Sequence, residues 1–184
     1  MKTGLIGVLA FSALTLSGRA STLPAPAPAA NGPNELALRN AAGNGDLSVV
    51  QSLLAQGANV NAGDSLGDTA LIDAAQNGHL DVVKALLADH ADVSAHGNSG
   101  STALEQAASN GHLDIVRTLL AHGAPVDESD GSGGTALVWA IDESHLDVAA
   151  VLLAHGANVG AVDSYIGDRI TRCSSRPTGR SQRR

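Results

Sequence analysis

Three histidines recur at a regular spacing and raise the question of whether the chain binds a metal ion. His79, His112 and His145 are 33 residues apart, and each is followed by Leu-Asp. The ligands of one zinc ion lie within about 2.0–2.1 Å of the metal, whereas neighbouring helices pack about 8–10 Å apart. Equivalent histidines on stacked helices therefore do not converge on one ion. We expect these histidines to be structural and no metal to be bound; a metal-binding protein is a remote alternative.

The other histidines also have structural explanations. His122 and His155 fall near the end of a predicted helix, where a cation interacts favourably with the helix dipole. His90 stands where equivalent positions hold a capping glycine, and His96 falls in a predicted hairpin. We interpret these two as tolerated substitutions.

Paired carboxyl groups could act as the acid and base of a hydrolase. Asp127, Glu128 and Asp130 fall in one predicted loop, and Asp142 and Glu143 follow. A glycosidase needs one carboxyl with a raised pKa in an enclosed cleft, and a chain with one Phe, one Trp and one Tyr offers few walls for one. The stretch DESDGSGG also lacks the spacing of a calcium loop, which leaves weak cation binding as a minor alternative. No nucleotide-binding or nucleophile motif occurs, so we expect no catalysis and no cofactor; an enzyme is a remote alternative.

The charge of the chain is unevenly distributed. Residues 34–165 hold 17 acidic and three basic residues, a net charge of −14, whereas residues 166–184 carry a net charge of +5. An acidic body with few aromatic residues argues against nucleic acid, whose binding needs basic patches and stacking platforms. The single cysteine, Cys173, has no partner in the chain for a disulfide.

The histidine spacing belongs to a larger repeat. DTALIDAAQNGHLDVVKALLADHADV is followed 33 residues later by STALEQAASNGHLDIVRTLLAHGAPV, and after a further 33 by GTALVWAIDESHLDVAAVLLAHGANV. A fainter copy, ELALRNAAGNGDLSVVQSLLAQGANV, precedes the three. Self-similarity at a fixed period of this size predicts a stacked repeat array. The four copies occupy residues 34–66, 67–99, 100–132 and 133–165.

Each copy predicts two helices followed by a turn or short hairpin. Thr69 and its equivalents precede a helix that they can cap, and Asn77-Gly78 ends that helix. Asp81 lies in the first turn of the second helix, where the dipole favours a negative charge, and a second glycine ends it in most copies. Apolar residues three and four apart give each helix one buried face; in the first helices these are Leu71, Ala74, Ala75, Leu104, Ala107, Ala108, Leu137, Ala140 and Ile141.

The motif T-A-L-x-x-A-A-x-x-G-H-L-D-V-V-x-x-L-L-A resembles the ankyrin repeat over residues 34–165. The resemblance implies an all-α solenoid of four stacked helix-turn-helix repeats, with projecting hairpins, a concave groove and a role in binding proteins. The chain departs from the family pattern at Thr69-Ala70-Leu71-Ile72 and its equivalents. These lack the proline that pre-organises the helix start and the histidine that ties repeat to repeat, so we expect less stability than in a consensus array.

The two ends of the chain have a different character. Residues 1–20 read as a signal peptide: Lys2, an apolar run too short to span a membrane, and a small-x-small cleavage site at Ala20. Residues 21–33 form a Pro/Ala-rich linker, and residues 166–184 a basic tail that we expect to be disordered. We therefore expect an exported protein, periplasmic or secreted and of bacterial origin, with no membrane insertion after cleavage.

The positions that vary between equivalent sites and point outward are the candidates for partner binding. The partner is expected to be another protein, bound by a monomer, and the acidic body favours a partner with a basic surface. A dedicated accessory protein or inhibitor of an exported enzyme is the alternative to a general adaptor. The candidate residues are Ser65, Leu66, Asp68, Gln76, His96, Asn98, Ser99, Ser101, Gln106, Ser109, Ser129, Ser132, Trp139 and Asp142.

Two residues of the last copy stand out. Trp139 is the only Trp and replaces the polar Asp73 and Gln106 of equivalent sites, so we expect it to be partly exposed. It either covers the open end of the stack or contacts the partner, because exposed large aromatics are enriched among binding hot spots. Ser144 replaces a capping glycine, and we expect it to be strained.

Overall fold

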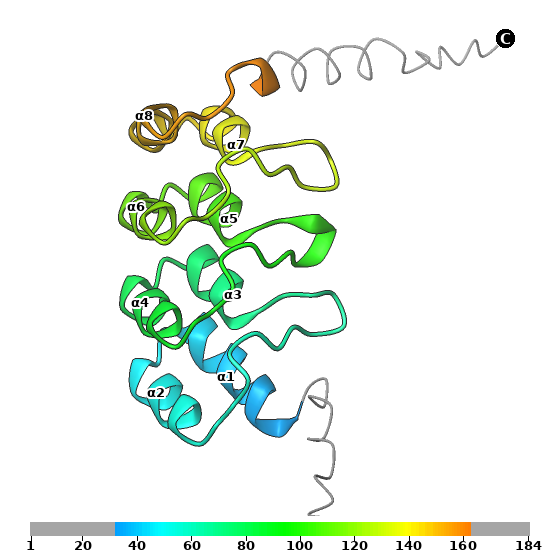
Figure 1. Cartoon of the computed structure of the whole chain (residues 1–184), viewed down its shortest axis with the longest axis vertical. Helices are drawn as coiled ribbons and strands as arrows, with labels where there is room; N and C mark the ends of the chain where they lie inside the picture. Colours follow the sequence, from blue (N-terminus) through cyan, green and yellow to red (C-terminus); the bar gives the residue numbers. More distant parts are fainter. Residues whose placement is uncertain (1–31, 163–184) are drawn as a thin grey trace, which may run out of the picture.

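Four pairs of helices stack in two columns in the computed structural model, which describes residues 32–162 (Figure 1). The first helices of the pairs pack on one another in one column, and the second helices form the other. The predicted repeat fold is confirmed. The first helices are α1 (Pro33–Asn44), α3 (Ala70–Gln76), α5 (Ala103–Ser109) and α7 (Ala136–Asp142), and the second are α2 (Leu47–Ala55), α4 (Leu80–Ala88), α6 (Leu113–Ala121) and α8 (Leu146–Ala154).

Threonine caps start three of the four first helices, as the sequence predicts. The hydroxyls of Thr69, Thr102 and Thr135 accept a hydrogen bond from the backbone N–H three residues later, at 3.3–3.4 Å. Helix α1 has no such cap; it begins at Pro33, which needs no hydrogen-bond acceptor for its nitrogen. This start lies one residue before the predicted first repeat.

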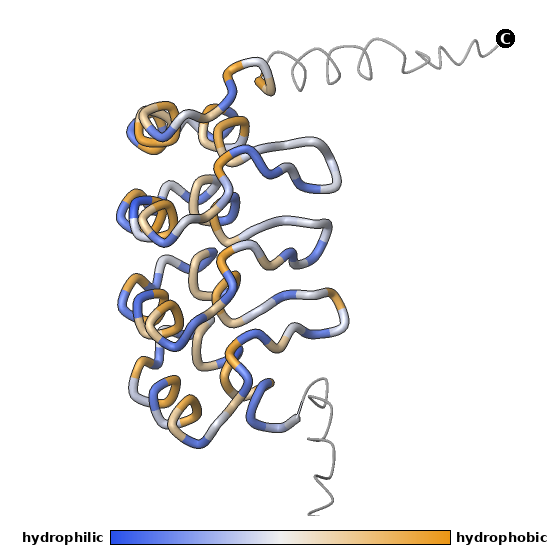
Figure 2. Tube along the Cα trace, in the orientation of Figure 1, coloured by the Kyte–Doolittle hydropathy of each residue, from blue (hydrophilic) through white to orange (hydrophobic). Residues whose placement is uncertain are grey.

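The core runs through the stack as one cluster of Leu, Val, Ile and Ala side chains. Figure 2 shows most of the hydrophobic segments in the two helix columns. The alanines of the first helices, such as Ala74 and Ala107, are fully buried, and their small size lets neighbouring helices approach closely. Ile141 is the exception to the predicted buried face. It is 39% exposed, because the next layer of helices that would cover it does not follow among the described residues.

Hairpins project from the column of first helices (Figure 1). Each is closed by an isolated antiparallel bridge, between Gly63 and Thr69, His96 and Thr102, and Ser129 and Thr135. The middle hairpin tip differs from the others because it contains a short 3-10 turn, η1 (Asn98–Gly100), in which Ser99 has a φ of 58°. The predicted hairpins are therefore present, with an irregular tip at the boundary of the second and third repeats.

Histidine side chains link successive repeats. The sequence alone did not reveal these links. His79 Nε2 lies 3.0 Å from the carbonyl oxygen of Gly43, and the same contact joins His112 to Gln76 and His145 to Ser109 at 3.1 Å. Each histidine precedes the second helix rather than lying within it. These three contacts give each repeat boundary a polar link.

Glycines leave room for these histidine rings. A β-carbon on Gly111 would lie 2.6 Å from His145 Nδ1, and Gly45 and Gly78 face the histidine of the next repeat in the same way. Ser144 occupies the equivalent position in the last repeat with a φ of 64°, so the expected left-handed backbone is present. No described residue supplies a histidine to face Ser144, and a β-carbon fits there.

The predicted signal peptide, nearly all of the linker and the basic tail lie outside the described residues. None of the helices within residues 32–162 combines the length and the apolar character that crossing a bilayer requires.

Candidate functional site

A hollow of about 330 Å³ lies against α3, α5, α7 and the hairpins that precede them. We call it the α3–α5–α7 hollow. Eight of the fourteen predicted surface residues line it, and they come from three successive repeats. These eight are Asp68, Gln76, Asn98, Ser99, Ser101, Gln106, Ser109 and Trp139.

The other six predicted residues lie outside the hollow and are exposed. Five of them sit on the hairpins, and Leu66 has an exposed fraction of 56%. Asp142 is the last residue of α7. The five on the hairpins are Ser65, Leu66, His96, Ser129 and Ser132.

Ser101 departs from the expectation of an outward-pointing side chain. It is only 9% exposed. Its hydroxyl donates to the carbonyl oxygen of Asn98 at 2.9 Å and accepts from Gln106 Nε2 at 3.1 Å. Ser101 therefore holds the hairpin against α5 at the wall of the hollow.

Glu105 is a lining residue that the sequence analysis missed. Its equivalents are Arg39, Ile72 and Val138, so a carboxyl group stands where two of the other three repeats hold an apolar side chain and the first holds an arginine. The residue is 2% exposed. The backbone N–H of Thr102 donates to Oε2 at 3.0 Å, whereas Oε1 is buried with no hydrogen-bond partner among the described residues. An acid where Ile72 and Val138 stand in the neighbouring repeats is the signal that would have identified it.

Burial controls the ionisation of Glu105. Desolvation raises its pKa from 4.5 to about 7, against the opposing effect of the Thr102 N–H. The nearby carboxylates of Asp130 and Glu128 raise the pKa further, and His96 lowers it. The carboxyl group therefore changes charge near neutral pH, where a cation in the hollow would favour its ionised form.

Trp139 forms an aromatic part of the wall. It is partly buried, and its indole Nε1 donates to Asp130 Oδ2 at 3.1 Å. The ring packs over Gly134, where a β-carbon would lie 2.6 Å from Nε1. The same Asp130 accepts the backbone N–H groups of Ser132 and Gly134 through Oδ1. The indole is thus fixed against its own hairpin and borders the space that α3 and α5 also line.

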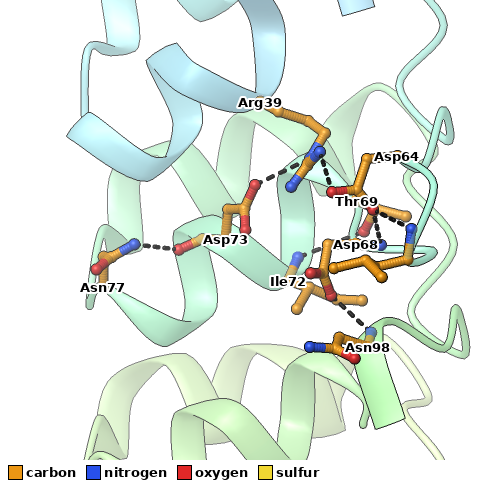
Figure 3. A network of polar contacts seen from close by, with 9 residues as sticks. Arg39, Asp64, Asp68, Thr69, Ile72, Asp73, Asn77 and Asn98 are labelled. Atoms are coloured by element: carbon orange, nitrogen blue, oxygen red, sulfur yellow. Dashed lines mark hydrogen bonds and ion pairs between the residues drawn. The ribbon is translucent and has the colours of Figure 1, made fainter. Parts of the chain in front are cut away.

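Hydrogen bonds join the hairpins at the rim of the hollow. Asp68 Oδ1 accepts the backbone N–H of Asn98 at 2.8 Å (Figure 3), and the carbonyl oxygen of Ser99 accepts the N–H of Gly131 at 2.6 Å. His96 contacts Glu128 Oε1 through Nε2 at 3.1 Å. Its Nδ1 contacts the carbonyl of Gly100, and that contact, together with Glu128, raises the pKa of His96. These bonds align the three hairpins before any partner binds.

An arginine occupies the corresponding region of the first two repeats. Arg39 of α1 contacts Asp73 at 3.0 Å and Asp64 at 2.8 Å (Figure 3). Burial raises the pKa of Asp73 despite the neighbouring guanidinium. Slight burial acts to raise the pKa of Asp64. Hydrogen bonds from the backbone N–H groups of Leu66 and Asp68, together with the Arg39 guanidinium, outweigh this effect and lower the pKa. The carboxylates at this end therefore already have a cation, in contrast to Glu105.

Residues 32–162 contain no cluster of three or more His, Cys, Asp or Glu side chains arranged to hold a metal ion. The histidines of the repeat ladder contact backbone carbonyls instead.

Comparison with known proteins supports the repeat architecture. A family model described as ankyrin repeats (3 copies) matches residues 25–96 and 90–163, which together cover more than half of the chain. No curated protein matches the chain.

Proposed function

Because the chain belongs to the ankyrin-repeat family, a family of protein–protein interaction modules, we propose that it binds its partner protein through the α3–α5–α7 hollow and the hairpins around it. The coincidence of the hollow with eight positions that vary between repeats supports this most directly. Positions that differ between repeats are not fixed by the common stacking pattern, so their side chains can be specific to one partner.

A pre-aligned surface favours binding because little ordering entropy is lost when the partner docks. The hairpin-to-hairpin bonds of Asp68 and Ser99 and the histidine links of His112 and His145 provide this rigidity. Binding by contact needs no catalytic group, and we propose no reaction for the chain.

The charge of the repeat region indicates the character of the partner. Residues 34–165 carry a net charge of −14, which attracts a basic protein and accelerates its association. We propose a partner with a basic surface, bound by a monomer. The opposite charge of residues 166–184 marks them as a separate element of the chain.

The signal-peptide features of residues 1–20 are the basis for placing this interaction outside the cytoplasm. We propose export to the periplasm or beyond, in a bacterium.

Affinity capture tests the proposal. The full chain is used as bait in an extract of the cell envelope, and bound proteins are identified by mass spectrometry. Ser109→Arg places a bulky cation in the hollow, whereas Ser52→Arg makes the same change on the exposed side of α2. We expect one basic protein to be retained by the wild type and Ser52→Arg and lost from Ser109→Arg. Equal retention by both variants, with unchanged melting temperatures, would contradict binding through the hollow.

A further inference from the structure

We propose that the α3–α5–α7 hollow accepts a basic side chain of the partner, with Glu105 as the buried counter-charge and Trp139 as the aromatic wall. This inference rests on the proposed binding function and specifies its chemistry. At about 330 Å³, the hollow is at the small end of the range of about 300–1,000 Å³ found for ligand pockets, which suits one side chain.

Glu105 is the first argument for a ligand. Buried polar groups almost always have hydrogen-bond partners, and an exception calls for an explanation. Oε1 of Glu105 has none among residues 32–162, although the side chain is 2% exposed and lines the hollow. A guanidinium or ammonium group is the donor that matches a lone carboxylate oxygen.

Helix capping does not account for the acid. Glu105 and Thr102 form a capping box at the start of α5. Thr69 and Thr135 cap α3 and α7 through their hydroxyls with an apolar residue at the position of Glu105. A buried acid is therefore not needed to start this helix, and its desolvation would be unfavourable without a further role.

The charges around Glu105 also favour a cation. Asp68 and Asp130 line the same hollow, and Glu128 lies close enough to raise the pKa of Glu105. No Lys or Arg of residues 32–162 lines the hollow; His96, whose charge lowers the pKa of Glu105, contacts Glu128. Arg39 neutralises Asp64 and Asp73 elsewhere on the surface, and the proposed ligand would do the same for Glu105.

Trp139 adds a second kind of contact. The face of an indole attracts cations, and the planar guanidinium of arginine both stacks on an aromatic ring and binds a carboxylate through two N–H groups. Asp130 fixes the indole in place. An aromatic wall in the same hollow as a buried carboxyl group with one unsatisfied oxygen is a combination that discriminates a basic side chain from a neutral one.

A peptide titration tests the inference without the natural partner. The probe is an acetylated and amidated pentapeptide with arginine between glycines, and its control carries citrulline, which has the shape of arginine but no charge. Trp139 is the only Trp of the chain, so its fluorescence reports on the hollow. Titration at pH 8 keeps Glu105 ionised. We expect saturable binding of the arginine peptide and at least about tenfold weaker binding of the citrulline peptide.

Variants of the full chain separate local recognition from general attraction. Glu105→Gln keeps the side-chain shape, and Glu105→Val reproduces Val138; both are expected to weaken arginine binding at least about tenfold. Glu143→Gln removes a charge outside the hollow and is expected to leave binding unchanged. Circular dichroism confirms that each variant is folded.

Three results would overturn the inference: no saturable signal up to about 10 mM peptide, equal binding of citrulline, or equal weakening by Glu105→Gln and Glu143→Gln. None of them bears on capture of a partner by the whole array. Conversely, a failed capture from the extract leaves the peptide titration unaffected, so the two proposals can fail separately.

Discussion

His112 reaches back across a repeat boundary: its Nε2 lies 3.1 Å from the carbonyl oxygen of Gln76, a residue 36 positions earlier that lines the hollow. A carbonyl only accepts hydrogen bonds, so the proton resides on Nε2. The contact ties the second helix of the third repeat to the first helix of the second repeat.

Removing this link should destabilise the array. His112→Ala leaves the carbonyl of Gln76 without its protein partner, and we expect a loss of about 1–2 kcal/mol in the free energy of unfolding. His122→Ala is the matched control, because His122 contacts only a carbonyl of its own helix and is exposed. We expect the control to change stability by less than about 0.5 kcal/mol. Urea denaturation measures both, and equal effects would show that the link is not stabilising.

The left-handed position after each first helix gives a second prediction. Ser144 has a φ of 64°, so Ser144→Gly should raise the free energy of unfolding by about 1 kcal/mol. Gly111→Ala, at the equivalent position, should be destabilising by more than that, because its β-carbon would meet the ring of His145. Thermal melting measures both variants. A lower melting temperature for Ser144→Gly would show that the side chain contributes a contact that outweighs the strain.

The pKa of Glu105 predicts a pH dependence of stability. The group has a pKa of about 7 when folded and an ordinary value of 4.5 when unfolded. Because the folded state holds the proton more tightly, protonation of Glu105 contributes to the free energy of unfolding. This contribution is fully present below about pH 4.5 and is lost as the pH rises through 7. It amounts to about 2–3 kcal/mol between pH 5 and pH 8.

Comparison with Glu105→Gln isolates this contribution, because all other titrating groups are retained. We expect the wild type to lose about 2–3 kcal/mol more than the variant between pH 5 and pH 8. Urea unfolding at the two pH values measures the difference. Parallel pH profiles would mean that the carboxyl group is ionised in the folded state at much lower pH.

The proposed export predicts the first residue of the mature chain. Cleavage after Ala20 should leave Ser21 as the first residue of protein recovered from outside the cytoplasm. Intact-mass spectrometry of the full-length gene product expressed in a bacterial host reads this terminus directly. Product that keeps Met1 and stays in the cytoplasmic fraction would contradict export.

Local features of the repeat could be predicted from the sequence because each depends on neighbouring residues. The cap at Thr69, the left-handed glycine at Gly78 and the acid in the first turn at Asp81 lie where the sequence placed them. The same applies to the strained backbone of Ser144.

Contacts between repeats could not be predicted, because they depend on how one layer is set against the next. The partners of His112 and Arg39 are 36 and 34 residues away in sequence. Glu105 was overlooked although Ile72 and Val138 signal a buried position; only the stacked structure shows that this position borders the hollow. The burial of Ser101 follows from its bonds to the hairpin and to α5, and the exposure of Ile141 from the absence of a following layer among residues 32–162.

Hydrogen exchange of the full chain, alone and with the captured partner, tests the central claim most directly. Binding through the α3–α5–α7 hollow predicts slower exchange in residues 68–76, 97–110 and 130–142, which contain α3, α5, α7 and the hairpin segments just before them. The account predicts no comparable change in α2, α4, α6 and α8, which form the other column. Protection confined to that second column, with unchanged exchange around Glu105 and Trp139, would contradict it.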